Sequence, residues 1–128
     1  MFDILDLNVK ENEIHIWSLS LNGPLYTGYK RYLKYLTPIE RSRANSIIHE
    51  HKKISYIVSH FYLRYLICSY LGLGFDDWTF NYNLYGKPFV PMHDLSFNMS
   101  HSGGKVVFSF SKNVPLGVDI EQIKKLMI

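Results

Sequence analysis

The order of apolar and polar positions predicts helices in the first half of the chain and short strands after them. Residues 13–21 alternate as a strand does, but the apolar face changes between Ile16 and Trp17. Such a change predicts a bulge, or a strand that is buried on both sides. The residues Asn22-Gly23-Pro24 predict a turn, and aromatic and leucine residues at helical spacing predict a short helix over 29–36.

The clearest helix start lies at residues 37–40. Thr37 offers a capping hydroxyl, a proline follows at the first helical position, and Glu40 stands three residues after the cap. We therefore predict a helix from about Pro38 to Glu50 whose inward residues are Ala44, Ile47 and Ile48.

A longer helix is predicted from about Ile54 to Tyr70, and it is apolar around most of its circumference. We expect it to be the central helix of the core. After it the period changes to two, which predicts strands at 78–82, 105–111 and 116–121, with turns at 85–88 and 112–115. The expected fold class is α+β, with helices packed on a small antiparallel sheet.

Composition limits the classes of protein that fit. The chain has 128 residues, 47% of them hydrophobic, so it fits one domain or one half of a two-lobed protein. Its one cysteine excludes an internal disulfide framework, which favours the cytoplasm. A net charge of +3 does not favour nucleic acid as a partner, and no membrane partner is expected because Arg64 interrupts the apolar stretch 56–75. The first residues do not resemble a signal peptide.

Two acids near the end of the chain give the strongest chemical signal. Asp119 and Glu121 lie two positions apart on a predicted strand, so both project from one face, ~7 Å apart at Cα. A hard cation such as Mg²⁺ is bound by one or two carboxylates, with water and phosphate oxygens as its other ligands. The alternative is an exposed strand edge that carries two solvated acids.

Two further segments suit a phosphorylated ligand. In Ser100-His101-Ser102-Gly103-Gly104, small polar residues and glycines let donors approach an anion, although the alternative is a plain glycine turn before the next strand. In Tyr85-Gly86-Lys87-Pro88, a rigid turn presents an ammonium group, although a solvated surface lysine is the common case. The basic residues Arg41, Arg43, Lys52 and Lys53 equally fit a solvated helix face.

In this order, three blocks resemble the surfactin-type 4′-phosphopantetheinyl transferases. They are Tyr85-Gly86-Lys87-Pro88-Phe89-Val90-Pro91, Phe97-Asn98-Met99-Ser100-His101-Ser102-Gly103 and Gly117-Val118-Asp119-Ile120-Glu121. The resemblance implies an enzyme that moves the phosphopantetheine arm of coenzyme A onto a serine of an acyl or peptidyl carrier protein, with Mg²⁺. It also implies the fold of one transferase lobe.

The resemblance also implies roles for particular residues. Asp119 and Glu121 would hold Mg²⁺ against the pyrophosphate, and they would be catalytic together with His101. Ser100 and His101 would contact the phosphates of coenzyme A.

The nucleotide end of coenzyme A is assigned to other residues by the same resemblance. Gly86, Lys87 and Pro88 would border the adenine nucleotide, and Arg43 would reach toward the 3′-phosphate.

The sequence departs from the family pattern in several places. The Trp-x-x-Lys-Glu block that supplies a third acid in the family's second lobe does not occur in these 128 residues. Glu40 and Ser55 stand where basic residues are usual. We therefore expect residues 1–128 to form the N-terminal lobe alone, without the C-terminal lobe, and to be inactive or impaired in isolation.

Three readings follow from these departures. The chain is a transferase lobe, or a degenerate module that binds coenzyme A or a carrier protein without turnover, or an interaction fragment without a ligand. Self-association in place of the second lobe is the further expectation, since removing a lobe exposes an apolar face.

Overall fold

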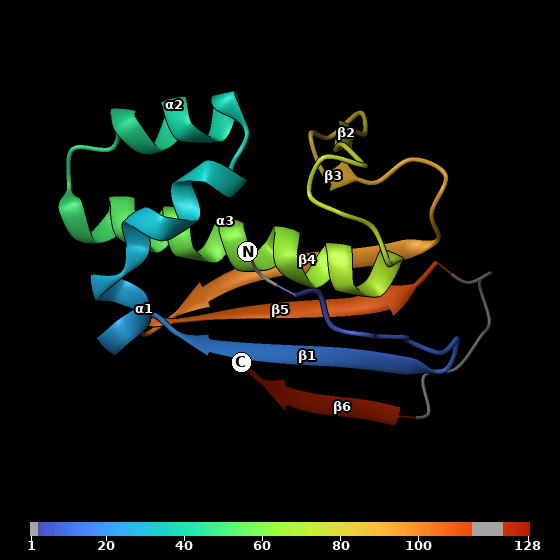
Figure 1. The fold of residues 1–128 in the computed structure, drawn as a ribbon. Coiled ribbons are helices and arrows are strands. Elements are labelled where there is room, and N and C mark those ends of the chain that lie inside the picture. Colours follow the sequence, from blue (N-terminus) through green and yellow to red (C-terminus); the bar gives the residue numbers. More distant parts are fainter. Residues whose placement is uncertain (1–2, 114–121) are drawn as a thin grey trace.

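The computed structural model describes residues 3–113 and 122–128 of the chain. Figure 1 shows three layers. A sheet forms the first, the long helix α3 (Glu50–Leu71) lies across it, and helix α2 (Pro38–Ser46) lies on the other side of α3. Beside α2 in this third layer is a small hairpin of β2 (Asn81–Tyr82) and β3 (Pro88–Phe89). The predicted α+β class is confirmed.

The main sheet has the strand order β4-β5-β1-β6. Strands β4 (Leu95–Ser102), β5 (Lys105–Lys112) and β1 (Glu13–Ser20) pair in antiparallel fashion, whereas β6 (Gln122–Met127) runs parallel to β1. The sheet is therefore mixed, where the sequence predicted a small antiparallel one. The strand predicted at 116–121 lies outside the described residues.

Strand β1 has no bulge, because its register with β5 is unbroken from Ile14 opposite Ser111 to Ser20 opposite Lys105. Its inner face consists of Glu13, His15, Trp17 and Leu19, each at most 6% exposed. The apolar pattern changed face because two polar residues occupy inner positions at the start of the strand.

These two polar residues belong to a network of polar contacts, in which His15 Nε2 lies 3.4 Å from Glu13 Oε1 without a hydrogen bond to any described residue. Glu13 accepts a hydrogen bond from the backbone N–H of Lys10 at 3.0 Å and pairs with Lys124 Nζ of β6 at 2.8 Å. His15 Nδ1 lies 2.6 Å from the Tyr70 hydroxyl, which also accepts from Trp17 Nε1 at 2.9 Å. The network thus ties the last strand and helix α3 to the central strand β1.

Helix α3 is the central helix, as predicted. Its buried residues include Ile57, Phe61 and Leu66, each 0% exposed, and they belong to the hydrophobic core. Phe61 stacks on Tyr32 with the ring centroids 4.4 Å apart. Gly72 ends the helix in the left-handed conformation that glycine adopts easily, with φ of 68°.

The first helices differ from the prediction in detail. The turn predicted at 22–24 begins the one-turn helix α1 (Gly23–Thr27), and the helix predicted at 29–36 is the 3₁₀ helix η1 (Tyr29–Tyr35). Helix α2 ends at Ser46, so Ile48 is 100% exposed and its inward placement was wrong. Ala44 is buried as predicted.

The strands before β5 were also predicted incompletely. Only Asn81–Tyr82 of the predicted strand 78–82 is a strand, and both residues are exposed. By contrast, the Ser-His run belongs to β4, and only Gly103 and Gly104 form the turn to β5, with φ of 54° and 77°.

Among the described residues, no helix is both long and apolar enough to cross a membrane.

Ile57 is buried and Ile48 is exposed, so the two residues give a matched test of the core. We expect Ile57→Ala to lower the free energy of unfolding by about 2–5 kcal/mol, since it leaves a cavity in a closely packed core. Ile48→Ala should change it by less than about 0.5 kcal/mol, because the side chain is in solvent. Urea denaturation of both variants checks this, and equal losses would contradict the assigned boundary between α2 and α3.

The ion pair between Glu13 and Lys124, which attaches β6 to β1, predicts that the stability of the fold depends on pH. The Lys124 ammonium, helped by the backbone N–H of Lys10, lowers the pKa of Glu13 to about 2. A carboxyl whose pKa is lower in the folded state stabilises the fold above its unfolded pKa of about 4.5, and this contribution is lost as the pH falls toward 2. The stability difference between wild type and Glu13→Gln should therefore shrink between pH 5 and pH 2 in urea titrations. A difference that stays constant over this range would contradict the ion pair.

Candidate functional site

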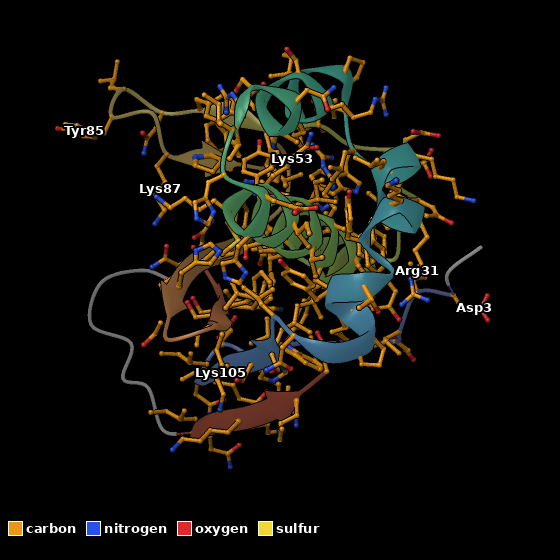
Figure 2. All side chains as sticks on the ribbon, turned by 90° about the vertical axis from the view of Figure 1, so that its left-hand side faces the viewer. Asp3, Arg31, Lys53, Tyr85, Lys87 and Lys105 are labelled. Carbon is orange, nitrogen blue, oxygen red and sulfur yellow. The ribbon has the colours of Figure 1, made fainter. Side chains whose placement is uncertain are left out.

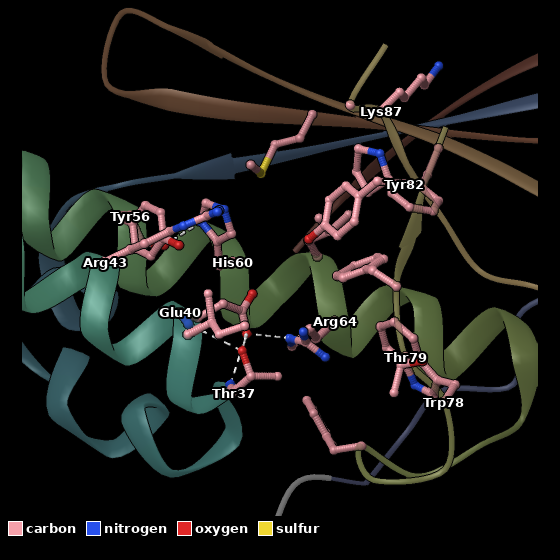
Figure 3. A pocket seen from close by; sticks show the side chains of 18 of the residues that line it. Thr37, Glu40, Arg43, Tyr56, His60, Arg64, Trp78, Thr79, Tyr82 and Lys87 are labelled. Atoms are coloured by element: carbon pink, nitrogen blue, oxygen red, sulfur yellow. Dashed lines mark hydrogen bonds and ion pairs between the residues drawn. The ribbon is translucent and has the colours of Figure 1, made fainter. Parts of the chain in front are cut away.

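A pocket of about 660 Å³ lies between α2, the N-terminal half of α3, and the β2–β3 hairpin with the loop before it. We call it the hairpin pocket. In Figure 3, Arg43, Tyr56 and His60 form one side, and Trp78, Thr79 and Tyr82 form the opposite side. Its lining includes four of the residues that the sequence analysis assigned to a nucleotide: Arg43, Gly86, Lys87 and Pro88.

A buried ion pair stands at the base of the hairpin pocket (Figure 3). Arg64 Nε donates to Glu40 Oε1 at 2.7 Å, and the side chains are 5% and 10% exposed. The same oxygen accepts from the backbone N–H of Thr37 at 2.9 Å and from the Thr37 hydroxyl at 3.2 Å. The capping box predicted from the sequence is present, and it holds the carboxylate where Arg64 of α3 reaches it.

Arg64 also fixes the loop that follows α3. Its guanidinium carbon lies 5.2 Å from the ring centroid of Trp78 and 5.0 Å from that of Phe80, distances at which cation–π attraction operates. The Trp78 indole N–H in turn donates to Cys68 Sγ at 3.2 Å. One arginine therefore connects α2, α3 and the loop that leads into the hairpin.

The side of the pocket on α3 is a stacked pair, Tyr56 and His60, with ring centroids 3.9 Å apart. His60 Nδ1 lies 2.9 Å from the Tyr56 carbonyl oxygen, which can only accept, so this nitrogen carries the proton. Burial lowers the pKa of His60, so its ring is neutral at neutral pH. Burial, aided by the Glu40 carboxylate, raises the pKa of Tyr56, and the nearby Arg43 opposes this rise.

The turn of the hairpin is rigid. The side-chain oxygen of Asn83 accepts the backbone N–H groups of Tyr85 and Lys87, both at 2.9 Å, and Gly86 has φ of 79°. Figure 2 shows Tyr85 at the tip of this turn, projecting away from the rest of the molecule. Lys87 and Pro88 instead line the pocket, so the turn presents its second half to a ligand.

A second pocket of about 400 Å³ adjoins the first and shares Tyr56 and His60 with it. Its lining includes the Gly103-Gly104 turn, the lysines Lys52 and Lys105, and His101. His60 and His101 both line this second pocket.

The structure separates Ser100 from His101. Both lie on β4, where neighbouring side chains point to opposite faces of the sheet. His101 is opposite Val106, whose side chain is on the buried face that α3 covers, and it lines the second pocket. Ser100 is opposite the half-buried Val107 on the other face, and it lines neither of the two pockets.

The predicted metal ligands Asp119 and Glu121 lie outside the described residues, so their placement stays a prediction. Within residues 3–113 and 122–128, no group of three or more acidic, histidine or cysteine side chains is arranged to hold a metal ion.

Comparison with known proteins decides the family. The family described as "4′-phosphopantetheinyl transferase, N-terminal" matches residues 22–113, which is more than half of the chain. The chain belongs to this family. The match covers α2, α3, the hairpin and both strands that border the glycine turn.

Individual relatives agree with this family. The chain is 29% identical to the 4′-phosphopantetheinyl transferase Sfp of Bacillus subtilis over 115 residues, which is 88% of this chain and 51% of the relative. It is 45% identical to the transferase gsp of Aneurinibacillus migulanus over 65 residues, 51% of this chain and 26% of the relative. It is 24% identical to the transferase HetI of Nostoc over 93% of this chain and 52% of the relative. The chain thus spans about half the length of relatives such as Sfp and HetI.

Four residues that line the hairpin pocket were not predicted as functional: Glu40, Tyr56, His60 and Arg64. The capping box located Glu40 but gave it only a local role. Arg64 was visible as a cation inside an apolar helix, which signals a buried partner, since an unpaired buried charge is costly. No local pattern marks Tyr56 or His60, because their role comes from the packing of α2 and the hairpin against α3.

The ion pair between Glu40 and Arg64 predicts how two variants differ in stability. Arg64→Met leaves the Glu40 carboxylate buried without its charged partner, and we expect a loss of about 3 kcal/mol or more in the free energy of unfolding. Adding Glu40→Gln removes the unpaired charge and keeps a side chain that can complete the capping box, so the double variant should regain part of the loss. Urea denaturation measures both, and a double variant less stable than Arg64→Met would contradict the interaction.

Proposed function

We propose that this chain is the coenzyme A-binding half of a 4′-phosphopantetheinyl transferase. The reaction moves the phosphopantetheine arm of coenzyme A onto a serine of an acyl or peptidyl carrier protein. The observation that carries the proposal is the hairpin pocket, where Arg43 of α2 and the turn residues Gly86, Lys87 and Pro88 line a single cavity. These segments are far apart in sequence, and their convergence supports the nucleotide roles that the family resemblance implies.

The residues around the cavity suit an adenine nucleotide in three respects. Trp78, Phe80 and Tyr82 supply flat apolar surface for a base. Arg43 and Lys87 supply positive charge for phosphate oxygens from two sides. The adjoining second pocket adds His101, Lys52 and Lys105, which suits a ligand with several phosphate groups.

The proposed chemistry is attack by the carrier serine oxygen on the β-phosphorus of coenzyme A. A new phosphodiester bond forms, the bond from that phosphorus to the bridging oxygen breaks, and adenosine 3′,5′-bisphosphate leaves while the serine loses its proton. Mg²⁺, which we propose is held by Asp119 and Glu121, would supply charge neutralisation for the pyrophosphate. The part of this chain is to bind and orient the nucleotide with Arg43, Lys87 and His101.

The isolated chain should transfer slowly or not at all. The 128 residues contain no Trp-x-x-Lys-Glu block, to which the family resemblance assigns a third acid and a base for the serine. The second candidate function is therefore a module that binds coenzyme A or a carrier protein without turnover, and the missing block favours it for this chain alone. Under either function, the single cysteine and the use of coenzyme A as ligand support a cytoplasmic location.

Calorimetry with coenzyme A and Mg²⁺ tests the proposed site. Arg43→Ala and Lys87→Ala should each weaken binding by roughly tenfold or more, because each removes a charge-assisted contact. Lys30→Ala, an exposed lysine on η1, is the control of equal charge and should leave binding unchanged. Binding that is insensitive to Arg43 and Lys87 would contradict the assignment of the hairpin pocket.

The metal role has its own test. A combined Asp119→Ala and Glu121→Ala variant should lose the Mg²⁺ dependence of coenzyme A binding. In a separate assay, coenzyme A with a fluorescent arm shows whether the chain modifies a carrier protein with Mg²⁺ present and absent. Modification by the chain alone would favour a complete enzyme over the binding module. Binding with unchanged Mg²⁺ dependence in the variant would remove the two acids from the proposal.

A further inference from the structure

Two residues of α3, Tyr56 and His60, line both the hairpin pocket and the second pocket. They lie about one helical turn apart, and their rings stack with the centroids 3.9 Å apart. The rest of the hairpin pocket supplies flat rings that suit a base, and the second pocket supplies Lys52 and Lys105, which suit phosphate groups. A nucleotide that fills both pockets therefore has its sugar at their junction, beside these two stacked rings.

His60 offers a hydrogen-bond acceptor at this junction. Its Nδ1 lies 2.9 Å from the Tyr56 carbonyl oxygen, which only accepts, so in the neutral ring Nδ1 carries the proton and Nε2 carries a lone pair. Burial lowers the pKa of His60, so the ring keeps this form at neutral pH. No described residue donates to Nε2, which is on the side of the ring away from the Tyr56 carbonyl. Since the side chain is half-buried and lines both pockets, this nitrogen is open to a donor of the ligand.

The chemistry of the nucleotide leaves one donor for this acceptor. Phosphate oxygens are acceptors, so a lone pair on a neutral imidazole repels them. The ring nitrogens of adenine beside the sugar are acceptors as well, and the amino group of the base is at its far end. In coenzyme A the 3′- and 5′-oxygens of the ribose are both bonded to phosphorus. The 2′-hydroxyl is therefore the one group of the sugar that can donate to Nε2.

The position of Arg43 agrees with this placement of the sugar. Arg43 is close enough to Tyr56 to oppose the rise in the pKa of its hydroxyl, and Figure 3 shows Arg43, Tyr56 and His60 together on one side of the hairpin pocket. The family resemblance assigns Arg43 to the 3′-phosphate. The 2′- and 3′-oxygens are on neighbouring carbons of the ribose, so a 3′-phosphate at Arg43 brings the 2′-hydroxyl toward the His60 ring.

We propose that His60 is a specificity-determining residue whose Nε2 accepts a hydrogen bond from the ribose 2′-hydroxyl of the bound nucleotide. The site then prefers a ribonucleotide over its 2′-deoxy counterpart. Tyr56 is a positioning residue, because its ring and its carbonyl oxygen hold the imidazole with Nε2 as the acceptor. This inference rests on the proposed function, since it assumes that the two pockets hold the nucleotide of coenzyme A.

Calorimetry of the full chain with two nucleotides tests the inference. The probes are adenosine 3′,5′-bisphosphate and 2′-deoxyadenosine 3′,5′-bisphosphate, which differ only in the 2′-hydroxyl. The 2′-deoxy nucleotide should bind about five- to tenfold more weakly, because it leaves Nε2 without a donor. Equal affinities, or tighter binding of the 2′-deoxy nucleotide, would overturn the inference and leave the proposed function intact. Binding of neither nucleotide would contradict both.

Variants of His60 separate this hydrogen bond from any effect of the missing hydroxyl on the sugar itself. His60→Phe keeps a ring against Tyr56 but removes the acceptor, so the ratio of the two affinities should fall to about one. His60→Gln can place an amide oxygen near the position of Nε2 and should retain the preference for the ribonucleotide. His93→Phe, at an exposed position between β3 and β4, is the matched control and should keep the wild-type ratio. A ratio that is unchanged in His60→Phe would overturn the role of His60.

Discussion

The contact between Glu40 and Arg64 organises the outer layer of this protein. Arg64 is 4% exposed on the central helix, so its charge needs a partner, and the capping box of α2 supplies one at 2.7 Å. The same guanidinium lies against Trp78 and Phe80, which positions the loop before the hairpin. The pair thus connects α2, α3 and this loop, which all border the hairpin pocket.

At the sheet, a second buried polar network likewise joins separate elements of the fold. Glu13 and His15 take inner positions on β1, and each contacts a residue from another element: Glu13 pairs with Lys124 of β6, and His15 contacts Tyr70 of α3. Polar groups buried in this way specify which elements meet, because an unsatisfied group would be costly. The two networks fix opposite sides of α3: one side faces the sheet, and the other faces the hairpin pocket.

The sequence predicted the parts of the fold that depend on local chemistry. The capping box of α2, the long apolar helix α3 and the α+β class follow from residues close together in the chain. Of the two alternatives for β1, the bulge is absent, and the inward placement of Ile48 was wrong, because burial there is decided by tertiary contacts: Glu13 pairs with Lys124, and α2 stops at Ser46. Of the candidate site, Arg43 and the turn 86–88 were found through the family pattern, whereas Glu40 and Arg64 gain their role only when α2 packs on α3.

The central claim is that the pocket beside this ion pair receives the nucleotide of coenzyme A. Nuclear magnetic resonance of the ¹⁵N-labelled chain tests it most directly, because each backbone amide reports its own surroundings. On addition of coenzyme A with Mg²⁺, the account predicts the largest shifts at the amides of Arg43, Thr79 and Lys87, with little change along β6. Shifts concentrated on β6, or spread evenly over the sheet, would contradict it.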